Sequence, residues 1–102
     1  MNEIKIPKEF QLFGIKIIIE FNEDRCDDKN AFGLAEFGKQ KIVLCRMEGR
    51  DLLPTEKVEK IYFHEVTHQI LDYMHEFDLS KNEKFVNIFS SLLHQALKTA
   101  KY

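Results

Sequence analysis

The hydrophobic and polar positions of the chain follow a short period in the first half and a helical period in the second half. Residues 13–21 (FGIKIIIEF) contain β-branched residues at the density of a strand, and we expect a β-strand there. Residues 22–30 are polar and predict a turn segment. Apolar runs at residues 32–37 and 40–45 surround a short gap that contains a glycine, which predicts a β-hairpin.

The first long helix is expected over residues 56–75, after a loop over residues 46–54. Pro54 ends extended structure, and Thr55 is placed to cap the helix. The apolar residues of this segment recur at helical spacing: Val58, Ile61, Tyr62, Val66, Ile70 and Met74. This spacing gives the helix one apolar side that can face a core.

A second helix is expected after a break over residues 76–79. Ser80 and Glu83 form the Ser-x-x-Glu pattern of a capping box. Apolar residues then recur along the helix: Phe85, Val86, Phe89, Leu92, Leu93 and Ala96. The order of the elements predicts an α+β fold, in which a small antiparallel sheet is followed by two helices.

The composition supports one globular domain over residues 1–102. Hydrophobic residues make up 44% of the chain and aromatic residues 12%, which is enough for a core and excludes a disordered or collagen-like chain. A domain of this length buries about 60–65% of the surface that its unfolded chain exposes. No repeat or flexible linker divides the sequence, so we expect a single core.

The charge of the chain excludes some classes of partner. The net charge is −2 and no long block of lysine or arginine is present, so we expect no nucleic-acid partner. The run at residues 17–19 is far too short to span a bilayer, and residues 1–5 lack the apolar region of a signal peptide. We therefore expect a cytoplasmic monomer without a membrane partner.

The two cysteines, Cys26 and Cys45, are expected to be free thiols, because the cytoplasm is a reducing compartment. Their spacing is not that of a zinc ribbon. Cys45 ends a predicted strand, where a buried cysteine behaves as a small hydrophobic residue. Cys45 is therefore interpreted as a core residue.

The segment His64-Glu65-Val66-Thr67-His68 carries the clearest chemical signal. On a helix, His64 and His68 are about 6 Å apart along the axis and project from nearly the same face. Two imidazoles in this arrangement can bind one Zn²⁺ at about 2.0–2.1 Å. Glu65 is turned by about 100° from His64, so it is poorly placed as a ligand but can reach a water molecule at the metal. This position favours Glu65 as a general base.

The alternative is that this pattern arises by chance. A chain of this length would contain His-Glu-x-x-His in roughly a few cases per thousand, and less often within a helix. Here the pattern lies inside a predicted helix with apolar flanks. We therefore expect a zinc site.

A catalytic zinc site needs a third protein ligand. The metzincin pattern requires glycine and histidine at positions that hold Leu71 and Met74, which excludes this subclass. Glu83 is the favoured ligand, because a turn over residues 76–79 would return the second helix antiparallel to the first. The alternative is that Glu83 only completes the capping box with Ser80.

Other polar residues near the pair are weaker candidates. His75 lies about 10 Å further along the helix axis than His68, so it needs the helix to end early. His94 is interpreted as an ordinary histidine on the second helix. Three acidic residues are expected to be solvated charges: Asp72, Glu76 and Asp78.

A family resemblance rests on FHEVTHQILDYMHEF and NEKFVNIFSSLLHQALK, preceded by AFGLAEFGKQKIVL. These segments resemble the minimal ImmA/IrrE-like zincin metallopeptidases encoded by phages and mobile elements of Gram-positive bacteria. The resemblance covers about residues 31–100. Its specific parts are the His-Glu-x-x-His segment and the segment that runs from Glu83 to Val86.

The resemblance implies a zincin core in which the sheet packs on the helix with the active-site residues. It implies that His64, His68 and Glu83 hold the zinc ion and that Glu65 is the base. Longer members of this family cleave repressor-type regulatory proteins and often carry a DNA-binding domain, for which this chain has no room. The expected partner is therefore a protein or peptide substrate, with regulatory proteins as one candidate class.

Two functions follow from the sequence. The first is a zinc-dependent metallopeptidase, in which Glu65 takes a proton from the attacking water and returns it to the leaving amine. The alternative is a zinc-stabilised binding or regulatory module of phage or mobile-element origin, without turnover, in which the metal reinforces a small core. Glu65 favours the peptidase, because a purely structural site has no use for a base.

The sequence also suggests how a peptide would bind. Zincins generally add the substrate as a strand to an exposed sheet edge, and residues 40–45 are a candidate for that edge. Tyr62, Tyr73 and His75 are each conceivable partners for the oxyanion. None of the three stands out.

Overall fold

The structure is a computed structural model, which describes residues 3–102. The strands are β1 (Glu9–Leu12), β2 (Ile15–Phe21), β3 (Gly33–Glu36), β4 (Lys41–Leu44), β5 (Met47–Glu48) and β6 (Asp51–Leu52). The helices are α1 (Glu23–Lys29), α2 (Thr55–Tyr73), α3 (Phe77–Ser80) and α4 (Glu83–Thr99), with a short 3-10 turn at Phe37–Lys39. Strands and helices are largely segregated along the chain, which confirms the predicted α+β fold.

The main sheet has the strand order β1-β2-β4-β3. The predicted strand and hairpin are present, because β2 covers most of residues 13–21 and β3 pairs antiparallel with β4. The prediction of an antiparallel sheet is wrong for one pair of strands. β2 and β4 run parallel, with Ile19 opposite Ile42. The reason is the connection between them, because α1 and β3 lie between β2 and β4 along the chain.

The predicted polar turn over residues 22–30 is wrong, because this segment forms the helix α1. Asn22 caps it, and its side-chain oxygen accepts a hydrogen bond from the backbone N–H of Arg25 at 3.0 Å. Acidic residues follow in the first turn, and Asn30 ends the helix with a φ of 51°. The segment therefore carries the start and stop signals of a helix, although its polar composition predicted a turn.

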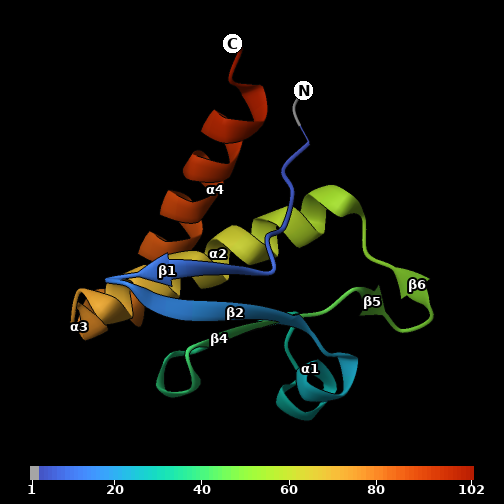
Figure 1. The fold of residues 1–102 in the computed structure, drawn as a ribbon. Coiled ribbons are helices and arrows are strands. Elements are labelled where there is room, and N and C mark those ends of the chain that lie inside the picture. Colours follow the sequence, from blue (N-terminus) through green and yellow to red (C-terminus); the bar gives the residue numbers. More distant parts are fainter. Residues whose placement is uncertain (1–2) are drawn as a thin grey trace.

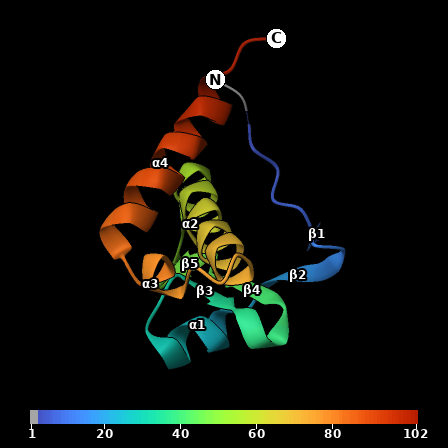
Figure 2. The same ribbon diagram turned by 90° about the vertical axis from the view of Figure 1, so that its left-hand side faces the viewer.

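The core lies between the sheet and α2. Ile17, Ile42 and Leu44 are fully buried on the sheet and pack with Tyr62 and Phe63 of α2. The two ribbon views place α2 on one side of the sheet and α1 on the other (Figure 1 and Figure 2). Burial of a large apolar side chain contributes about 1.5–3 kcal/mol, so these contacts fix the position of α2 on the sheet.

A buried polar contact fixes α2 along the sheet as well. Gln69 is fully buried, and its side-chain amide donates a hydrogen bond to the backbone oxygen of Lys41 in β4 at 2.9 Å. Gln69 directly follows His68. The register of α2 on the sheet is therefore set one residue away from a candidate ligand.

The turn between the two long helices brings the start of α4 back to α2. The helix α2 ends at Tyr73, and His75 has a left-handed backbone with a φ of 59°. After α3, the helix α4 begins at Glu83 and packs along α2, as both ribbon views show (Figure 1 and Figure 2). The predicted antiparallel return of the second helix is confirmed by the contact of Glu59 with Lys98 near the other ends of the two helices.

The predicted caps of both long helices are wrong. The residue before α2 is Pro54, which provides no side-chain cap, and Thr55 is already the first helical residue. The cap of α4 is Asn82, whose side-chain oxygen accepts a hydrogen bond from the backbone N–H of Phe85 at 3.1 Å. Ser80 therefore does not form a capping box with Glu83, and the side chain of Glu83 has no capping role there.

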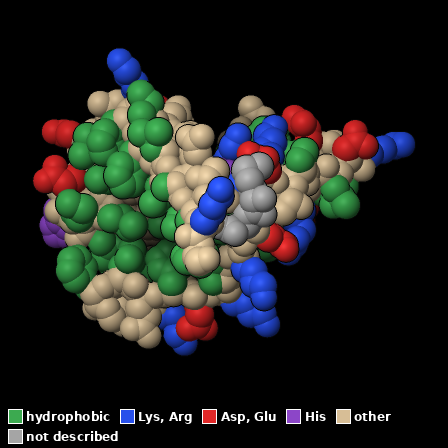
Figure 3. Space-filling view, turned by 90° about the horizontal axis from the view of Figure 1, so that it is seen from above, with side chains coloured by type: hydrophobic (Ala, Val, Ile, Leu, Met, Phe, Trp, Pro, Cys, Tyr) green, Lys and Arg blue, Asp and Glu red, His purple; other side chains and the backbone are tan. Residues whose placement is uncertain are grey.

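The surface of the molecule contains several large exposed hydrophobic residues on the β1–β2 turn, α2 and α4. They include Phe13, Ile70, Met74, Phe89 and Leu92. In the view from above, hydrophobic side chains gather on the left part of the surface (Figure 3). Among residues 3–102, no helix is long and apolar enough to cross a membrane.

Candidate metal centre

Three side chains from α2 and α4 converge at one point. The Nε2 atoms of His64 and His68 are 3.2 Å apart. One carboxylate oxygen of Glu83 is 3.3 Å from Nε2 of His64, and the other is 3.1 Å from Nε2 of His68. The structure therefore brings together all three residues that the sequence proposed as ligands.

The spacing of these atoms fits a tetrahedral metal site. Ligand atoms at about 2.0–2.1 Å from a zinc ion, at tetrahedral angles, are about 3.3–3.4 Å from each other. The Nε2 atoms of His64 and His68 are close to this separation, and each of them is also close to it from a different oxygen of the Glu83 carboxylate. One ligand atom from each of the three residues lies within 4.8 Å of the other two. Two neutral imidazoles and one carboxylate are also a ligand set that zinc binds in catalytic sites. The donor set and its spacing therefore fit Zn²⁺.

Neighbouring side chains orient both histidines. Nδ1 of His68 is 3.1 Å from the hydroxyl oxygen of Ser80, a residue that is almost fully buried. Asn87 is a hydrogen-bond partner of His64. Histidine ligands in metal sites usually bond the second ring nitrogen to such a partner, which fixes the ring and its tautomer. The contact with Ser80 therefore leaves Nε2 of His68 as the ligand atom.

The protonation of His64 also favours metal binding. Burial lowers the pKa of His64, and the neighbouring His68 lowers it further, although Glu83 and Asn87 act in the opposite direction. A lowered pKa keeps the imidazole neutral near pH 7. The neutral imidazole is the form that binds a metal ion.

Glu65 lies beside the cluster and points toward β3. Its side chain is only 8% exposed, and burial raises its pKa to about 8, with a further contribution from the charge of Glu83. The backbone of Gly33 lies so close that a Cβ atom there would be 2.6 Å from Ile61 and 3.0 Å from Glu65. Glycine at position 33 therefore allows β3 to approach the proposed base.

A pocket of about 400 Å³ opens beside the two helices and includes His64 and Glu65. One wall is the start of β3, and another is the α4 segment that carries Asn87. The side chain of Glu83 is 60% exposed, so the group of three candidate ligands is open to solvent. The arrangement therefore has access for a substrate, which a closed structural metal site lacks.

The weaker ligand candidates lie elsewhere. His75 is exposed and stacks on Phe77, with ring centroids 5.4 Å apart. His94 is almost fully buried and bonds to Glu59. The remaining three acidic candidates are not part of the cluster found among residues 3–102: Asp72, Glu76 and Asp78.

The suggested oxyanion partners do not reach the pocket. Tyr62 is buried in the core, where burial raises its pKa to about 12. Tyr73 packs against Phe37, and His75 is on the exposed turn after α2. None of the three lines the pocket beside His64.

The proposed substrate edge needs a correction. Residues 40–45 contain β4 (Lys41–Leu44), which lies inside the sheet between β2 and β3. The free edge next to α2 is β3. The sequence alone did not reveal this order, because an antiparallel hairpin does not indicate which of its strands pairs with a third strand.

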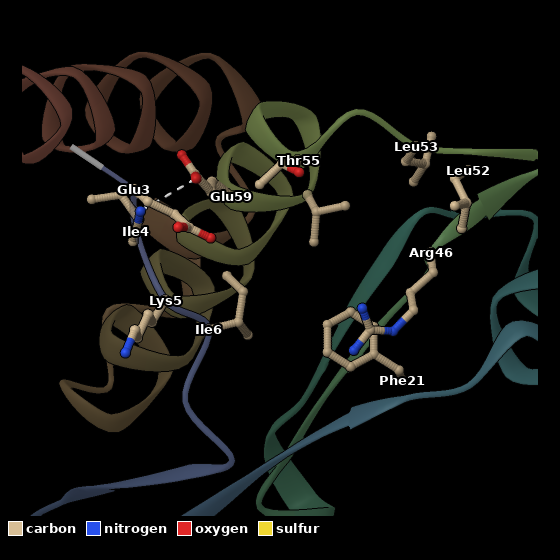
Figure 4. A pocket seen from close by; sticks show the side chains of 11 residues that line it. Glu3, Ile4, Lys5, Ile6, Phe21, Arg46, Leu52, Leu53, Thr55 and Glu59 are labelled. Carbon is tan, nitrogen blue, oxygen red and sulfur yellow. Dashed lines mark hydrogen bonds between the residues drawn. The ribbon is translucent and has the colours of Figure 1, made fainter. Parts of the chain in front are cut away.

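A larger hollow of about 480 Å³ lies away from these residues, and none of the three candidate ligands lines it. The guanidinium group of Arg46 stacks over Phe21 at 3.6 Å from the ring centroid (Figure 4). Glu59 accepts a hydrogen bond from the backbone of Ile4 in the same hollow. This carboxylate is already bound to His94 and Lys98, so Glu59 is not a free acid in this hollow.

Comparisons with known proteins do not identify a family. No protein-family model, no curated protein and no solved structure matches this chain significantly. The site therefore has to be interpreted from its own geometry.

Sequence reasoning missed three residues that shape the site. The sequence pattern predicts Ser80 only as a cap and Gly33 only as part of a strand, and it gives Asn87 no role. The signal for Asn87 was its spacing of four residues from Glu83, which places both on one face of a helix. No comparable signal existed for Gly33, because its role depends on how β3 packs on α2.

Proposed function

We propose that this protein is a zinc-dependent metallopeptidase with His64, His68 and Glu83 as ligands and Glu65 as general base. The observation that carries this proposal is the convergence of two imidazole nitrogens and a carboxylate within 4.8 Å of one another, with a buried carboxyl group beside them. When bound, zinc would polarise a substrate carbonyl and lower the pKa of a bound water toward 7. This part of the proposal follows from the ligand set.

The residues of the chain have separate tasks in this mechanism. Glu65 accepts a proton from the attacking water and then donates it to the leaving amine. In the metal-free protein, burial raises the pKa of Glu65 to about 8, which suits the return of a proton to the leaving amine. The positive charge of a bound zinc ion would lower this pKa and favour the carboxylate form that accepts the proton. Ser80 and Asn87 hold the two imidazoles in position. The free edge of β3 offers backbone groups to an extended peptide.

The alternative is a zinc-stabilised binding module without turnover. The open pocket and the position of Glu65 favour the peptidase over this alternative, because neither feature is needed in a structural site. The deciding group is therefore Glu65. Its removal should separate chemistry from metal binding.

The test compares the parent protein with Glu65→Gln on a broad peptide library, with cleavage products identified by mass spectrometry. Loss of a general base typically lowers the rate on the order of 10²–10⁴-fold. We expect zinc-dependent cleavage by the parent and a near-complete loss in Glu65→Gln, with unchanged zinc content. Glu76→Gln is the matched control, because Glu76 is exposed and lies outside the cluster.

Two results would contradict the proposal. Equal cleavage by parent and Glu65→Gln would remove Glu65 from the mechanism. Absence of cleavage by the zinc-loaded parent, together with equal capture of a peptide by both proteins, would favour the binding module.

A further inference from the structure

The pocket beside the metal cluster has an uneven distribution of charge. It extends from His64 along α2 toward the start of that helix, where Lys57 and Lys60 line it. Glu65 is the only acidic residue among the described residues that line the pocket. The end of the pocket away from the metal cluster is therefore positively charged.

Lys57 is held at the wall of this pocket. Its ammonium nitrogen lies 4.4 Å from the ring centroid of Phe32, which lines the same pocket. Lys57 forms no ion pair with any residue of the described part of the chain. A cation–π contact keeps the charge near the pocket without neutralising it.

Lys60 has only a weak acidic partner. Its ammonium nitrogen lies 3.7 Å from a carboxylate oxygen of Glu56, and both side chains are more than half exposed. Exposed ion pairs of this kind contribute little, because solvent screens them. The charge of Lys60 therefore remains available to a group that enters the pocket.

We propose that Lys57 and Lys60 bind a carboxylate of the substrate one or two residues from the bond to be cleaved. On α2, the two lysines precede His64 by about 10 Å and about 6 Å along the axis. An extended peptide advances about 3.3 Å per residue, and the side chain of Asp or Glu adds a further reach of a few ångström. When the carbonyl of the bond to be cleaved lies beside His64, a carboxylate one or two residues away therefore reaches Lys57 and Lys60.

This proposal rests on the proposed function and names its substrate class. The carboxylate has two sources with the same chemistry, namely an internal Asp or Glu side chain and the free carboxyl terminus of a peptide. Both would pair with the two lysines, and two neighbouring positive charges attract one carboxylate more strongly than a single charge does. The peptides of the test distinguish the two sources.

The experiment measures peptide binding to zinc-loaded Glu65→Gln by fluorescence anisotropy, and cleavage by the parent in parallel. Matched peptides carry Glu or Gln beside the same bond, each with a free or an amidated carboxyl terminus. We expect about 10-fold tighter binding of the peptides that contain the carboxylate, and a smaller difference at high salt. The position of the preferred Glu relative to the cleaved bond is read from the products.

The variant Lys57→Glu/Lys60→Glu should lose this preference or reverse it in favour of a peptide with lysine at the same position. The control Lys8→Glu/Lys16→Glu makes the same change in net charge at the opposite edge of the sheet from β3. Lys8 directly precedes β1, and Lys16 lies in β2. The control should keep the preference. Circular dichroism checks that both variants are folded.

The results separate this inference from the proposed function. Equal binding of Glu and Gln peptides, or an unchanged preference in Lys57→Glu/Lys60→Glu, would overturn the carboxylate subsite even if the parent cleaves peptides. A preference that is present in binding while the parent cleaves nothing would support the subsite and contradict the peptidase.

Discussion

The helices α2 and α4 contain two histidine–glutamate clusters with very different surroundings. One combines His64 and His68 of α2 with Glu83 of α4. The other combines Glu59 of α2 with His94 of α4, and their side chains are bonded at 2.8 Å. The same residue types thus face each other twice between the same two helices.

The difference lies in what occupies the space between the side chains. In the second cluster, the ammonium nitrogen of Lys98 lies 2.9 and 3.0 Å from the two carboxylate oxygens of Glu59. Glu59 and His94 are almost fully buried. In the first cluster, Glu83 has no lysine or arginine partner among residues 3–102, and its side chain is 60% exposed. The chain supplies its own cation at one cluster, whereas the other cluster fits the proposed metal ion.

This comparison shows that histidine and glutamate alone do not predict a metal site. A lysine four residues after His94 converts one cluster into a structural network that joins the helices. Two histidines on one helix face, with their Nε2 atoms and a carboxylate at 3.1–3.3 Å, favour metal binding at the other. The two clusters therefore serve as controls for each other.

The largest expected difference concerns metal content. The parent should bind about one zinc ion per chain, and His68→Ala should lose it, because two protein ligands rarely hold zinc at micromolar concentration. His94→Ala should keep its zinc, because His94 is bonded to Glu59. Elemental analysis after dialysis measures both. Retention of zinc in His68→Ala, or its loss in a folded His94→Ala, would invalidate the comparison.

The two glutamates should show opposite effects on stability and on metal affinity. Glu59→Gln removes the charge that compensates Lys98 in a buried network, so the free energy of unfolding should fall on the order of 3 kcal/mol. Glu83→Gln weakens a metal ligand and should lower zinc affinity with little change in the stability of the metal-free protein. Urea unfolding with a chelator and competition with a zinc indicator provide the two measurements.

Glu83→Gln also tests the ligand role of Glu83 separately from the stability of the start of α4. Asn82 caps α4, so we expect unchanged helicity in Glu83→Gln. Unchanged zinc affinity would remove Glu83 from the ligand set and leave the site with two histidines.

The buried carboxyl groups of the two regions should respond to pH in opposite directions. Burial raises the pKa of Glu65 to about 8, so the folded, metal-free protein holds a proton that the unfolded chain releases above about 4.5. Stability should therefore fall as pH rises from about 5 to 8. Glu65→Gln should remove this loss and be more stable than the parent at pH 8, on the order of a few kcal/mol.

Glu59 should cause the opposite trend at low pH. Burial raises the pKa of Glu59, but the hydrogen bonds from His94 and Lys98 outweigh it and the net pKa is lowered. Its contribution to stability is present above the unfolded pKa and is lost as pH falls below it. Urea unfolding in chelator over pH 3–8 tests both trends. Parallel curves for parent and Glu65→Gln would contradict the raised pKa of Glu65.

The sequence predicted the parts of the site that lie on one helix or depend on a simple turn. The four-residue spacing of His64 and His68 is a property of α2 alone. The position of Glu83 required only that the second helix return antiparallel, which the polar break after α2 indicated. The α+β class followed from the order of strand-like and helix-like segments, and the structure confirms it.

Two of the incorrect predictions, the strand pairing and the substrate edge, have a common physical origin in contacts between distant segments. The parallel pairing of β2 and β4 depends on how α1 and β3 pack, and local patterning does not encode it. The edge role of β3 depends on the same packing. The helix α1 was missed for a different reason, because its charged residues looked like a loop although Asn22 and Asn30 mark its ends.

The smallest expected effect concerns Ser80, the residue whose role changed most between sequence and structure. Its hydroxyl oxygen lies 3.1 Å from Nδ1 of His68, whereas His94 bonds to the carboxylate of Glu59. Removing a partner of a ligand histidine typically costs 10–100-fold in metal affinity, because the ring loses its fixed orientation and tautomer. Ser80→Ala should therefore weaken zinc binding by about 10-fold, and Ser80→Thr should restore part of it. Thr99→Ala, at the far end of α4, should leave zinc affinity unchanged. Equal zinc affinity of Ser80→Ala and the parent would show that packing alone holds His68 in place.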